Sequence, residues 1–346
     1  MPIVQYEDLR TLSLDLLLAA KVPEDDAAIV AEHLATSHLV GHDSHGVSFL
    51  PRYIKMWRAS YVGWEQRIME KETPALAIID GKGSNGIAAV TRLSELAVEK
   101  ARYSGFGFVG LRNVSHIGRL GDYPPRIAAR EMIGMVWMNG GGCLLAPFGS
   151  ADRRLRPEPM AYAIPRREGP PFMLDICMSV VAGGKVEQKT VRKEQIPDGW
   201  LIGHDGNYVN EGTLYGDPEN NAVMPLGGLQ FGHKGYGLAM IVEMIVGPLT
   251  RAGCTKDGPG GGGIMILAID IAQFNDLETH YREVESLVDW VRSARPLPGV
   301  DKIYAPGEKE EETRQQRLQE GIELPEPTWQ ELSTIAVELG VSMPKG

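Results

Sequence analysis

Short apolar segments that alternate with helical patterns constrain the fold of this chain most strongly. Strand-type runs are expected at 75–79, 106–111 and 132–138, and helical patterns separate them. Each run is followed by polar and glycine residues, as at Arg112-Asn113 and at Asn139-Gly140. This arrangement is typical of an α/β domain that binds its ligands at the strand ends.

The two ends of the chain carry helical patterns instead. Leucines and alanines recur at helical spacing near the N-terminus, and Thr328 to Glu331 forms a capping box for a last helix that Gly340 ends. We therefore expect a helical subdomain made of residues 1–74 and 305–346. The α/β core then occupies residues 75–304.

The composition excludes several classes of protein. A net charge of -10 argues against partners such as nucleic acid or an anionic membrane. No apolar run approaches the roughly 18 to 20 residues that a transmembrane helix needs. The N-terminus lacks the pattern of a signal peptide, and Cys143, Cys177 and Cys254 show no metal-type pairing. We expect a cytoplasmic protein with reduced thiols.

A glycine fingerprint follows the first strand. Gly81, Gly83 and Gly86 match G-x-G-x-x-G between a strand and a helix, and Arg112 after the next strand suits a 2′-phosphate. Taken alone, this pattern predicts an NADP site. A plain strand-turn-helix connection is the competing interpretation, because three glycines are a weak signal.

Three polar clusters are candidates for a functional site. The stretch from Gly41 to Val47 holds two histidines, a carboxylate and a hydroxyl, which is costly in a core unless each group has a partner. The alternative is a solvated helix end that Gly46 terminates. A second cluster follows a strand at 113–121. The third, 232–237, places glycines and Lys234 before an apolar helix and predicts an anion cradle.

Together these motifs resemble the malate/L-lactate dehydrogenase family of the sulfolactate, ureidoglycolate and 2,3-diketogulonate dehydrogenase type. The resemblance covers nearly the whole chain. It is carried by Asp43-Ser44-His45-Gly46-Val47, residues 113–118, Ala146-Pro147-Phe148-Gly149, Leu174-Asp175, residues 232–237 and Pro306-Gly307-Glu308.

The resemblance implies a non-Rossmann, sulfolactate-dehydrogenase-like α/β fold with a mixed-sheet core. It also implies a homodimer with its active site near the interface, and hydride transfer between NAD or NADP and a 2-hydroxy/2-oxo acid or a related imine or polyol. The Gly81-Gly83-Gly86 fingerprint then becomes a structural turn.

The resemblance also assigns roles to residues. His45 is the acid/base, because histidine can both take and give a proton near neutral pH. Ser44 orients it, and His116 is the second candidate for the same role. Phe49, Arg52 and Tyr53 are expected to bind the substrate. The cofactor is expected to contact His116, Gly118, Leu120, Asn139, Gly140, Asp175, Ile176, Lys185, His233, Lys234, Gly235, Gly307 and Glu308.

Three departures from the family pattern fall in the expected active site. Phe49 stands where the family usually has an arginine that can clamp a substrate carboxylate. Residues 155–159 are Leu-Arg-Pro-Glu-Pro instead of Leu-Gly-Thr-Asn-Pro, and Gly140 replaces a serine.

Phe49 predicts a substrate that is bulkier or less anionic than malate or lactate. The alternative is a homologue without redox activity, such as a lyase-like enzyme or a ligand-binding protein, while retained Asn139, Asp175 and Lys234 favour the dehydrogenase. We expect no metal site, because His42 and Asp43 do not easily face inward together.

Overall fold

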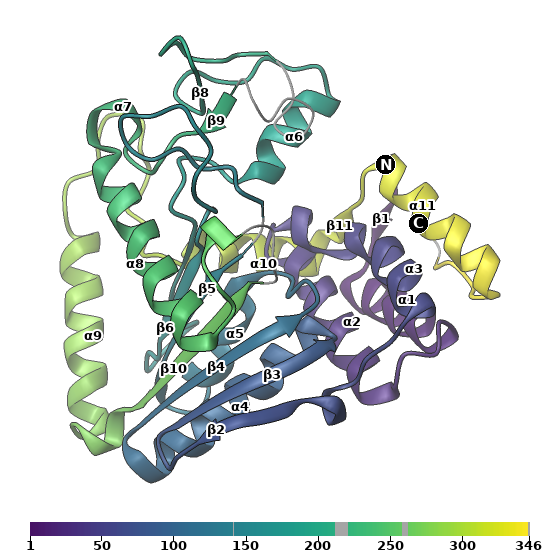
Figure 1. The fold of residues 1–346 in the computed structure, drawn as a ribbon, viewed down its shortest axis with the longest axis horizontal. Helices are drawn as coiled ribbons and strands as arrows, with labels where there is room; N and C mark the ends of the chain where they lie inside the picture. The colour runs from purple at the N-terminus through teal and green to yellow at the C-terminus, as the bar shows by residue number, and fades with distance from the viewer. Residues whose placement is uncertain (141, 212–220, 258–261, 345–346) are drawn as a thin grey trace.

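A mixed sheet of seven strands forms the centre of the molecule (Figure 1). The computed structural model describes residues 1–140, 142–211, 221–257 and 262–344. In spatial order the strands are β2 (Ile68–Glu72), β3 (Leu76–Ser84), β4 (Phe106–Val114), β10 (Gly263–Asp270), β5 (Met132–Asn139), β6 (Met160–Ile164) and β7 (Phe172–Ile176).

Only β3 and β4 pair in parallel within this sheet, and the other neighbours are antiparallel. The helix α4 (Gly86–Ser104) makes the crossover between β3 and β4, as parallel neighbours require. The strand β10 lies between β4 and β5, with Ile266 opposite both Val109 and Val136. The predicted mixed-sheet α/β core is confirmed.

Helices cover both faces of the sheet. On one face, α4 and α5 (Tyr123–Ala128) bury a core with residues from β3, β4, β5 and β10. On the other face, α8 (His233–Thr250) packs Val242 and Val246 against Met265 of β10. The helix α9 (Leu277–Arg292) runs along the outside and buries Val288 alone among its residues.

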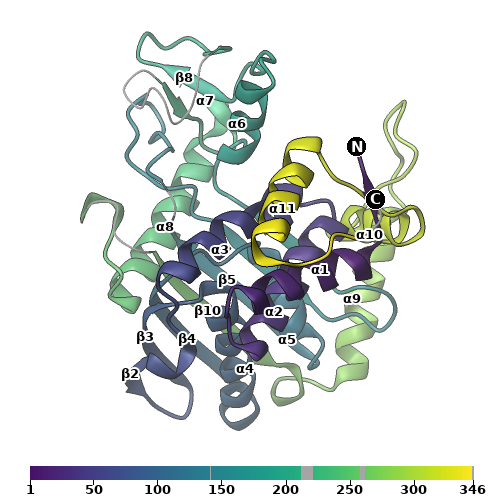
Figure 2. The same ribbon diagram turned by 90° about the vertical axis from the view of Figure 1, so that its right-hand side faces the viewer.

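The two ends of the chain pack together beside the sheet (Figure 2). Strand β1 (Ile3–Val4) pairs with β11 (Ile322–Glu323), and one apolar core joins residues such as Leu16 and Leu34 to Leu332. The helices of this unit are α1 (Tyr6–Ala19), α2 (Glu24–Leu39), α3 (Leu50–Ala59), α10 (Glu308–Glu320) and α11 (Glu326–Leu339).

The division between the helical subdomain and the α/β core at residue 74 stays a prediction, and one element near it needs a correction. Strand β2 lies inside the range 1–74, but it pairs with β3 and so belongs to the sheet. The alternation in β2 is weak, because most of its residues are exposed at the edge of the sheet.

A smaller lobe lies above the sheet in Figure 1 and contains α6 (Gly183–Val191), β8 (Leu201–Gly203), β9 (Asn221–Val223) and α7 (Gly228–Phe231). The Asp205-Gly206 turn predicts a long loop over 197–221, but β8 lies inside this range and pairs with β9, which begins at its end. Three-residue strands leave too little periodicity to be recognised. Residues 212–220, and 258–261 of the predicted glycine loop, lie outside the described residues.

Two predicted helix starts are wrong. The last helix begins at Glu326 and not after Thr328, because Pro327 in its first turn is compatible with a helix start and no side chain caps it. The apolar helix α8 begins at His233, five residues earlier than Leu238, so Gly235 and Gly237 lie inside it. Gly340 ends α11 in a left-handed conformation, as predicted.

The glycine fingerprint is a structural turn. Asn85 caps α4 by accepting the N–H of Ala88, and the N–H of Gly86 donates to Ser115 Oγ at 2.9 Å. A Cβ atom at Gly86 would lie 2.1 Å from the Ser115 carbonyl oxygen, so close backbone packing explains this glycine. Arg112 is paired with Glu70 at 2.6 Å, which leaves it no role with a 2′-phosphate.

Within the described residues, no helix combines the length and the apolar character that crossing a bilayer demands.

Candidate active site

The turn that carries Ser44 and His45 is held from two sides. Val47 donates its N–H to His38 Nδ1 at 3.0 Å, and a Cβ atom at Gly46 would lie 1.7 Å from the same nitrogen. On the other side, Arg317 of α10 forms an ion pair with Asp43. Gly46 and Asp43 therefore shape this turn, while Ser44 and His45 remain available for chemistry.

His45 is a neutral, half-buried imidazole. Ser44 Oγ lies 3.1 Å from its Nδ1, which orients the ring as predicted. Burial lowers the pKa of His45 to about 4, and nearby His42, His33 and Arg119 act in the same direction. An uncharged ring at neutral pH can accept a proton, so His45 is suited to act as a base.

His45 and His116 are 71 positions apart in the sequence and were predicted as alternative candidates for the acid/base role. The structure brings them next to each other. Their rings are stacked with centroids 6.0 Å apart. Phe49 lies parallel to His116 at 4.9 Å, and the Tyr53 hydroxyl is 2.5 Å from His116 Nδ1. We call His45, Phe49, Tyr53 and His116 the histidine cluster.

The hydrogen bonds of His116 determine which nitrogen carries its proton. Gly118 donates its N–H to His116 Nδ1 at 3.3 Å, and a backbone N–H cannot accept in return. Desolvation lowers the pKa of His116 below its ordinary value, and the neighbouring His45 adds to the effect. The neutral ring therefore carries its proton on Nε2. Part of the ring is exposed, so the cluster can be reached from solvent.

A buried network fixes the loop that carries His116. His33 faces Asp122 across 3.1 Å, and its other nitrogen accepts the N–H of Arg119 at 2.9 Å. Gly118 has a φ of +68°, and a Cβ atom there would lie 2.0 Å from His33 Nε2. Burial alone would raise the pKa of Asp122. The opposing effect of His33 and Arg126 is larger and brings the pKa well below its ordinary value, so the carboxylate stays charged.

His33 and His38 lie on α2, where helical spacing alone predicts ordinary helix residues. Both are almost fully buried and each accepts a backbone N–H from a different loop of the site. The sequence does show a polar ring at each of these positions on the apolar side of a helix. Such a ring needs a hydrogen-bond partner once it is buried.

Several predicted cofactor residues converge beside the His116 loop. Asp175 at the end of β7 accepts the N–H of Gly121 at 2.8 Å, and burial raises its pKa. The N–H of Met173 donates to the Pro306 carbonyl at 3.1 Å, and Gly307 follows with a φ of +95°. The region therefore joins the ends of β4 and β7 to the start of α10. Leu120 is buried there, Ile176 is half-buried, and Glu308 accepts the N–H of Ala305.

The predicted anion cradle at 232–237 is partly used by the protein itself. The N–H groups of Gly235 and Tyr236 donate to carbonyls of Leu226 and Gly232. His233 packs edge-on against Phe148, and Lys234 lies over the ring of Phe231 at 5.3 Å. Lys185 is exposed on α6, whose Gly184 approaches Ser44.

Asn139 does not point into an open site. Its side chain is fully buried, donates to Glu243 and to the Gly253 carbonyl, and accepts the N–H of Gly263 at 2.7 Å. The polar atoms of this amide join β5 to β10 and α8, and the cofactor contact of Asn139 stays a prediction. At Gly140, a Cβ atom would overlap the end of the Met138 side chain.

The unusual segment at 155–159 is buried behind Asn139. Arg156 donates to the Asn139 carbonyl at 3.4 Å, and Glu158 faces Glu243 from a left-handed backbone conformation with φ of +45°. Arg156 and Glu158 have exposed fractions of 2% and 0%, so neither lines an open pocket. The expectation that residues 155–159 change the active site stays a prediction.

Glu158 and Glu243 together hold one proton at neutral pH. Burial and the neighbouring Glu243 raise the pKa of Glu158 to about 10. Burial acts on Glu243 as well, but hydrogen bonds from Thr255 bring its pKa below the ordinary value. Two adjacent carboxyl groups cannot both ionise cheaply, so the proton stays between them.

Two charged surface grooves lie away from the histidine cluster. One, of about 820 Å³, lies between α3 and α11 and is lined by Arg52, Lys55 and Glu331 among others. Arg52 lines this groove, although its charge still helps to lower the pKa of His116. The substrate contact of Arg52 stays a prediction.

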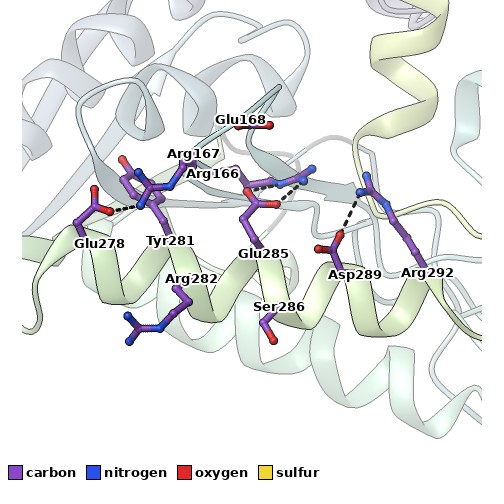
Figure 3. Close-up of a pocket in the computed structure, with 10 residues that line it drawn as sticks. All are labelled: Arg166, Arg167, Glu168, Glu278, Tyr281, Arg282, Glu285, Ser286, Asp289 and Arg292. Carbon is purple, nitrogen blue, oxygen red and sulfur yellow. Dashed lines mark hydrogen bonds and ion pairs between the residues drawn. The ribbon is translucent and has the colours of Figure 1, made fainter.

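The other groove, of about 710 Å³, lies between α9 and the β6–β7 turn (Figure 3). Arg166 pairs with Glu285 at 2.7 Å and Arg167 pairs with Glu278. Arg292 approaches Asp289 and Glu308. These arginines are neutralised by acids of the protein, so the groove is a poor anion site. Over the described ranges, no three His, Cys, Asp or Glu side chains gather as metal ligands.

The sequence and the fold both match known proteins along nearly their full length. The pattern of the malate/L-lactate dehydrogenase family matches residues 4–333. Malate dehydrogenase of Pyrococcus horikoshii is 35% identical over 98% of this chain and 96% of its own, and L-lactate dehydrogenase of Cupriavidus necator is 33% identical over 99% of both. The structure of sulfolactate dehydrogenase from Methanocaldococcus jannaschii superposes with a TM-score of 0.86 at 30% identity, covering 99% of this chain and 98% of its own.

The fold is thus the α/β architecture of the sulfolactate dehydrogenase type, and the named relatives are dehydrogenases. The chain belongs to the malate/L-lactate dehydrogenase family. The resemblance inferred from its motifs is confirmed.

The carboxyl pair predicts a stability that falls with rising pH. In the unfolded chain Glu158 loses its proton above its ordinary pKa of 4.5. In the folded chain it keeps the proton until the pH reaches about 10. Between these values the free energy of unfolding should fall by up to about 1.4 kcal/mol per pH unit. Glu158→Gln should flatten this slope, as measured by urea unfolding from pH 5 to 9.

The matched control is Glu95→Gln, at an exposed position on α4, which should keep the slope of the wild-type protein. An unchanged slope in Glu158→Gln would show that the pair does not retain its proton.

Proposed function

We propose that this protein is an NAD(P)-dependent oxidoreductase that transfers hydride between nicotinamide and a 2-hydroxy/2-oxo acid or a related compound. The observation that carries the proposal is the neutral His45, oriented by Ser44 and stacked on His116. Oxidation of a hydroxyl carbon needs a base that takes the hydroxyl proton as hydride leaves. Membership of the family supports the reaction class.

The two histidines divide the work on the substrate oxygen. His45 takes the proton of the hydroxyl group during oxidation and returns it during reduction. His116 carries a proton on Nε2 and donates a hydrogen bond, because Gly118 and Tyr53 occupy its Nδ1. A fixed donor of this kind stabilises negative charge that develops on the oxygen.

The residues beside the His116 loop fit a nicotinamide cofactor, which when bound supplies or accepts the hydride. Gly121 packs against Asp175, where a Cβ atom would lie 2.5 Å from Oδ2, and the half-buried carboxyl of Asp175 can accept hydrogen bonds. Exposed lysines at 185 and 234 suit the phosphates. A fluorescence titration with NADH and NADPH distinguishes NAD from NADP as the cofactor.

Phe49 gives the site an apolar wall. Its ring covers one face of His116 and lies 6.2 Å from His45, so an apolar surface adjoins both imidazoles. The position has no charge to offer a carboxylate. This supports a substrate that is bulkier or less anionic than malate or lactate.

The first prediction of the proposed function concerns His45. The wild-type protein should bind NADH or NADPH, observed as a change of tryptophan fluorescence, because Trp137 lies in β5 next to the cofactor region. His45→Ala should keep this binding but lose about 10²- to 10⁴-fold in kcat, because the proton transfer is lost. His204→Ala, at an exposed histidine of the upper lobe, is the control.

Failure of the folded wild-type protein to bind either nucleotide would favour the non-redox alternative. Binding with full activity in His45→Ala would instead transfer the acid/base role to His116.

The second prediction concerns Phe49. Phe49→Arg should raise kcat/KM for small anionic 2-oxo acids, most for oxaloacetate with its second carboxylate, because it supplies a cation beside His45 and His116. Phe49→Leu, which keeps an apolar wall without a charge, is the control. No gain across a panel of such acids would contradict the role given to Phe49.

We also propose a cytoplasmic homodimer, as the resemblance implies. Cys143, Cys177 and Cys254 form no disulfide within the described residues, which supports a reducing compartment. Helix α8 buries one face against the sheet and exposes large apolar side chains on the other, which supports a second copy of this chain as the covering partner. These exposed residues are Leu238, Ile241, Met244, Ile245 and Leu249, with Leu229 and Phe231 of α7.

The third prediction tests the dimer. Ile241→Glu places a charge on the exposed face of α8, where 55% of the isoleucine is accessible in the single chain. Light scattering after size exclusion should give a dimer for the wild-type protein and a monomer for this variant. Val337→Glu, at an 82% exposed site on α11, should remain dimeric. A monomeric wild-type protein would refute the assembly.

A further inference from the structure

Arg119 is a buried cation with unused hydrogen-bond donors. It lies three residues after His116 in the same loop, and only 5% of it is exposed. Its Nη2 is 3.6 Å from Asp122 Oδ1. In the part of the chain that the structure describes, its Nε and Nη1 are buried and have no hydrogen-bond partner. Buried donors are nearly always paired in native proteins, so these N–H groups call for a ligand.

The guanidinium lies between the His116 loop and the end of β7. A Cβ atom at Gly121 would be 3.0 Å from Arg119 Nη1 and 2.5 Å from Asp175 Oδ2, so these two groups flank the same glycine. The charge of Arg119 also acts on His45 and on Glu310. Arg119 therefore occupies the region where the acid/base residue and the predicted cofactor residues meet.

The acids around Arg119 have partners of their own. Asp122 pairs with Arg126 and faces His33, each at 3.1 Å or less. Asp175 accepts the N–H of Gly121. Glu310 lies 3.8 Å from His42. Arg119 also attracts Asp175 and Glu310, but its Nε and Nη1 donate to none of these acids.

We propose that Arg119 binds the carboxylate of the substrate beside His45, in place of the arginine that the family usually carries at the position of Phe49. This inference rests on the proposed function and narrows its substrate class. One carboxylate is held by Arg119, and Phe49 offers an apolar wall to the rest of the molecule. The substrate is then a 2-hydroxy or 2-oxo monocarboxylic acid with an apolar substituent.

The test uses oxamate, a small 2-oxo monocarboxylate that does not react, added to the full-length protein in the presence of NADH. Arg119→Gln should weaken oxamate binding about 10- to 100-fold, because a charge-assisted hydrogen bond is lost, and leave the Kd of NADH unchanged. Arg119→Lys keeps the charge beside Asp122 and should fold, but it loses the planar fork and should bind oxamate more weakly than the wild-type protein.

Arg126→Gln is the matched control, because it removes another cation from Asp122 on a side chain that is 36% exposed. It should keep the wild-type Kd for oxamate, which separates binding by Arg119 from support of the loop. Weaker NADH or NADPH binding with unchanged oxamate in Arg119→Gln would assign the arginine to a cofactor phosphate and overturn the proposal.

The proposal would also be overturned if Arg52→Gln lost oxamate binding while Arg119→Gln kept it. If the wild-type protein binds no nicotinamide nucleotide, the proposed function itself fails. That outcome is seen before any arginine is changed.

Discussion

Two histidines on one helix hold the whole site in place. His33 and His38 lie on the buried side of α2, and each accepts a backbone N–H from a different loop. Each contact requires a glycine, Gly118 against His33 and Gly46 against His38, because a Cβ atom would overlap the ring. The loops that carry His45 and His116 are therefore positioned by the same rigid element, and their two imidazoles stack as a result.

Charge in the interior of this protein follows a consistent pattern. Asp122 is charged because His33 and arginines surround it, whereas Glu158 keeps a proton because its close neighbour is another carboxylate. Both are buried, so their different states come from their partners and not from burial alone. The substitutions at 155–159 consequently alter the support behind β5, while the change to Phe49 alters the site itself.

Much of the fold was predictable from local pattern. The strands β3, β4 and β5 and the helix α1 fall where apolar periodicity placed them. The pattern failed at β8 and β9, which are too short to show a period, and at the start of α8, where glycines inside the helix resemble a loop. The glycine fingerprint misled because close packing against Ser115 selects glycine as effectively as a phosphate does.

The sequence alone determined the family and the class of fold, and it predicted His45 and His116 as acid/base candidates, because these depend on motifs that are local in the chain. The tertiary structure alone decided that Phe49 stacks on His116, that Asn139 turns inward and that Arg119 is buried with unused donors. Hydrogen bonding and burial join residues far apart in sequence, and no local pattern records which partners a polar group finds once water has been removed.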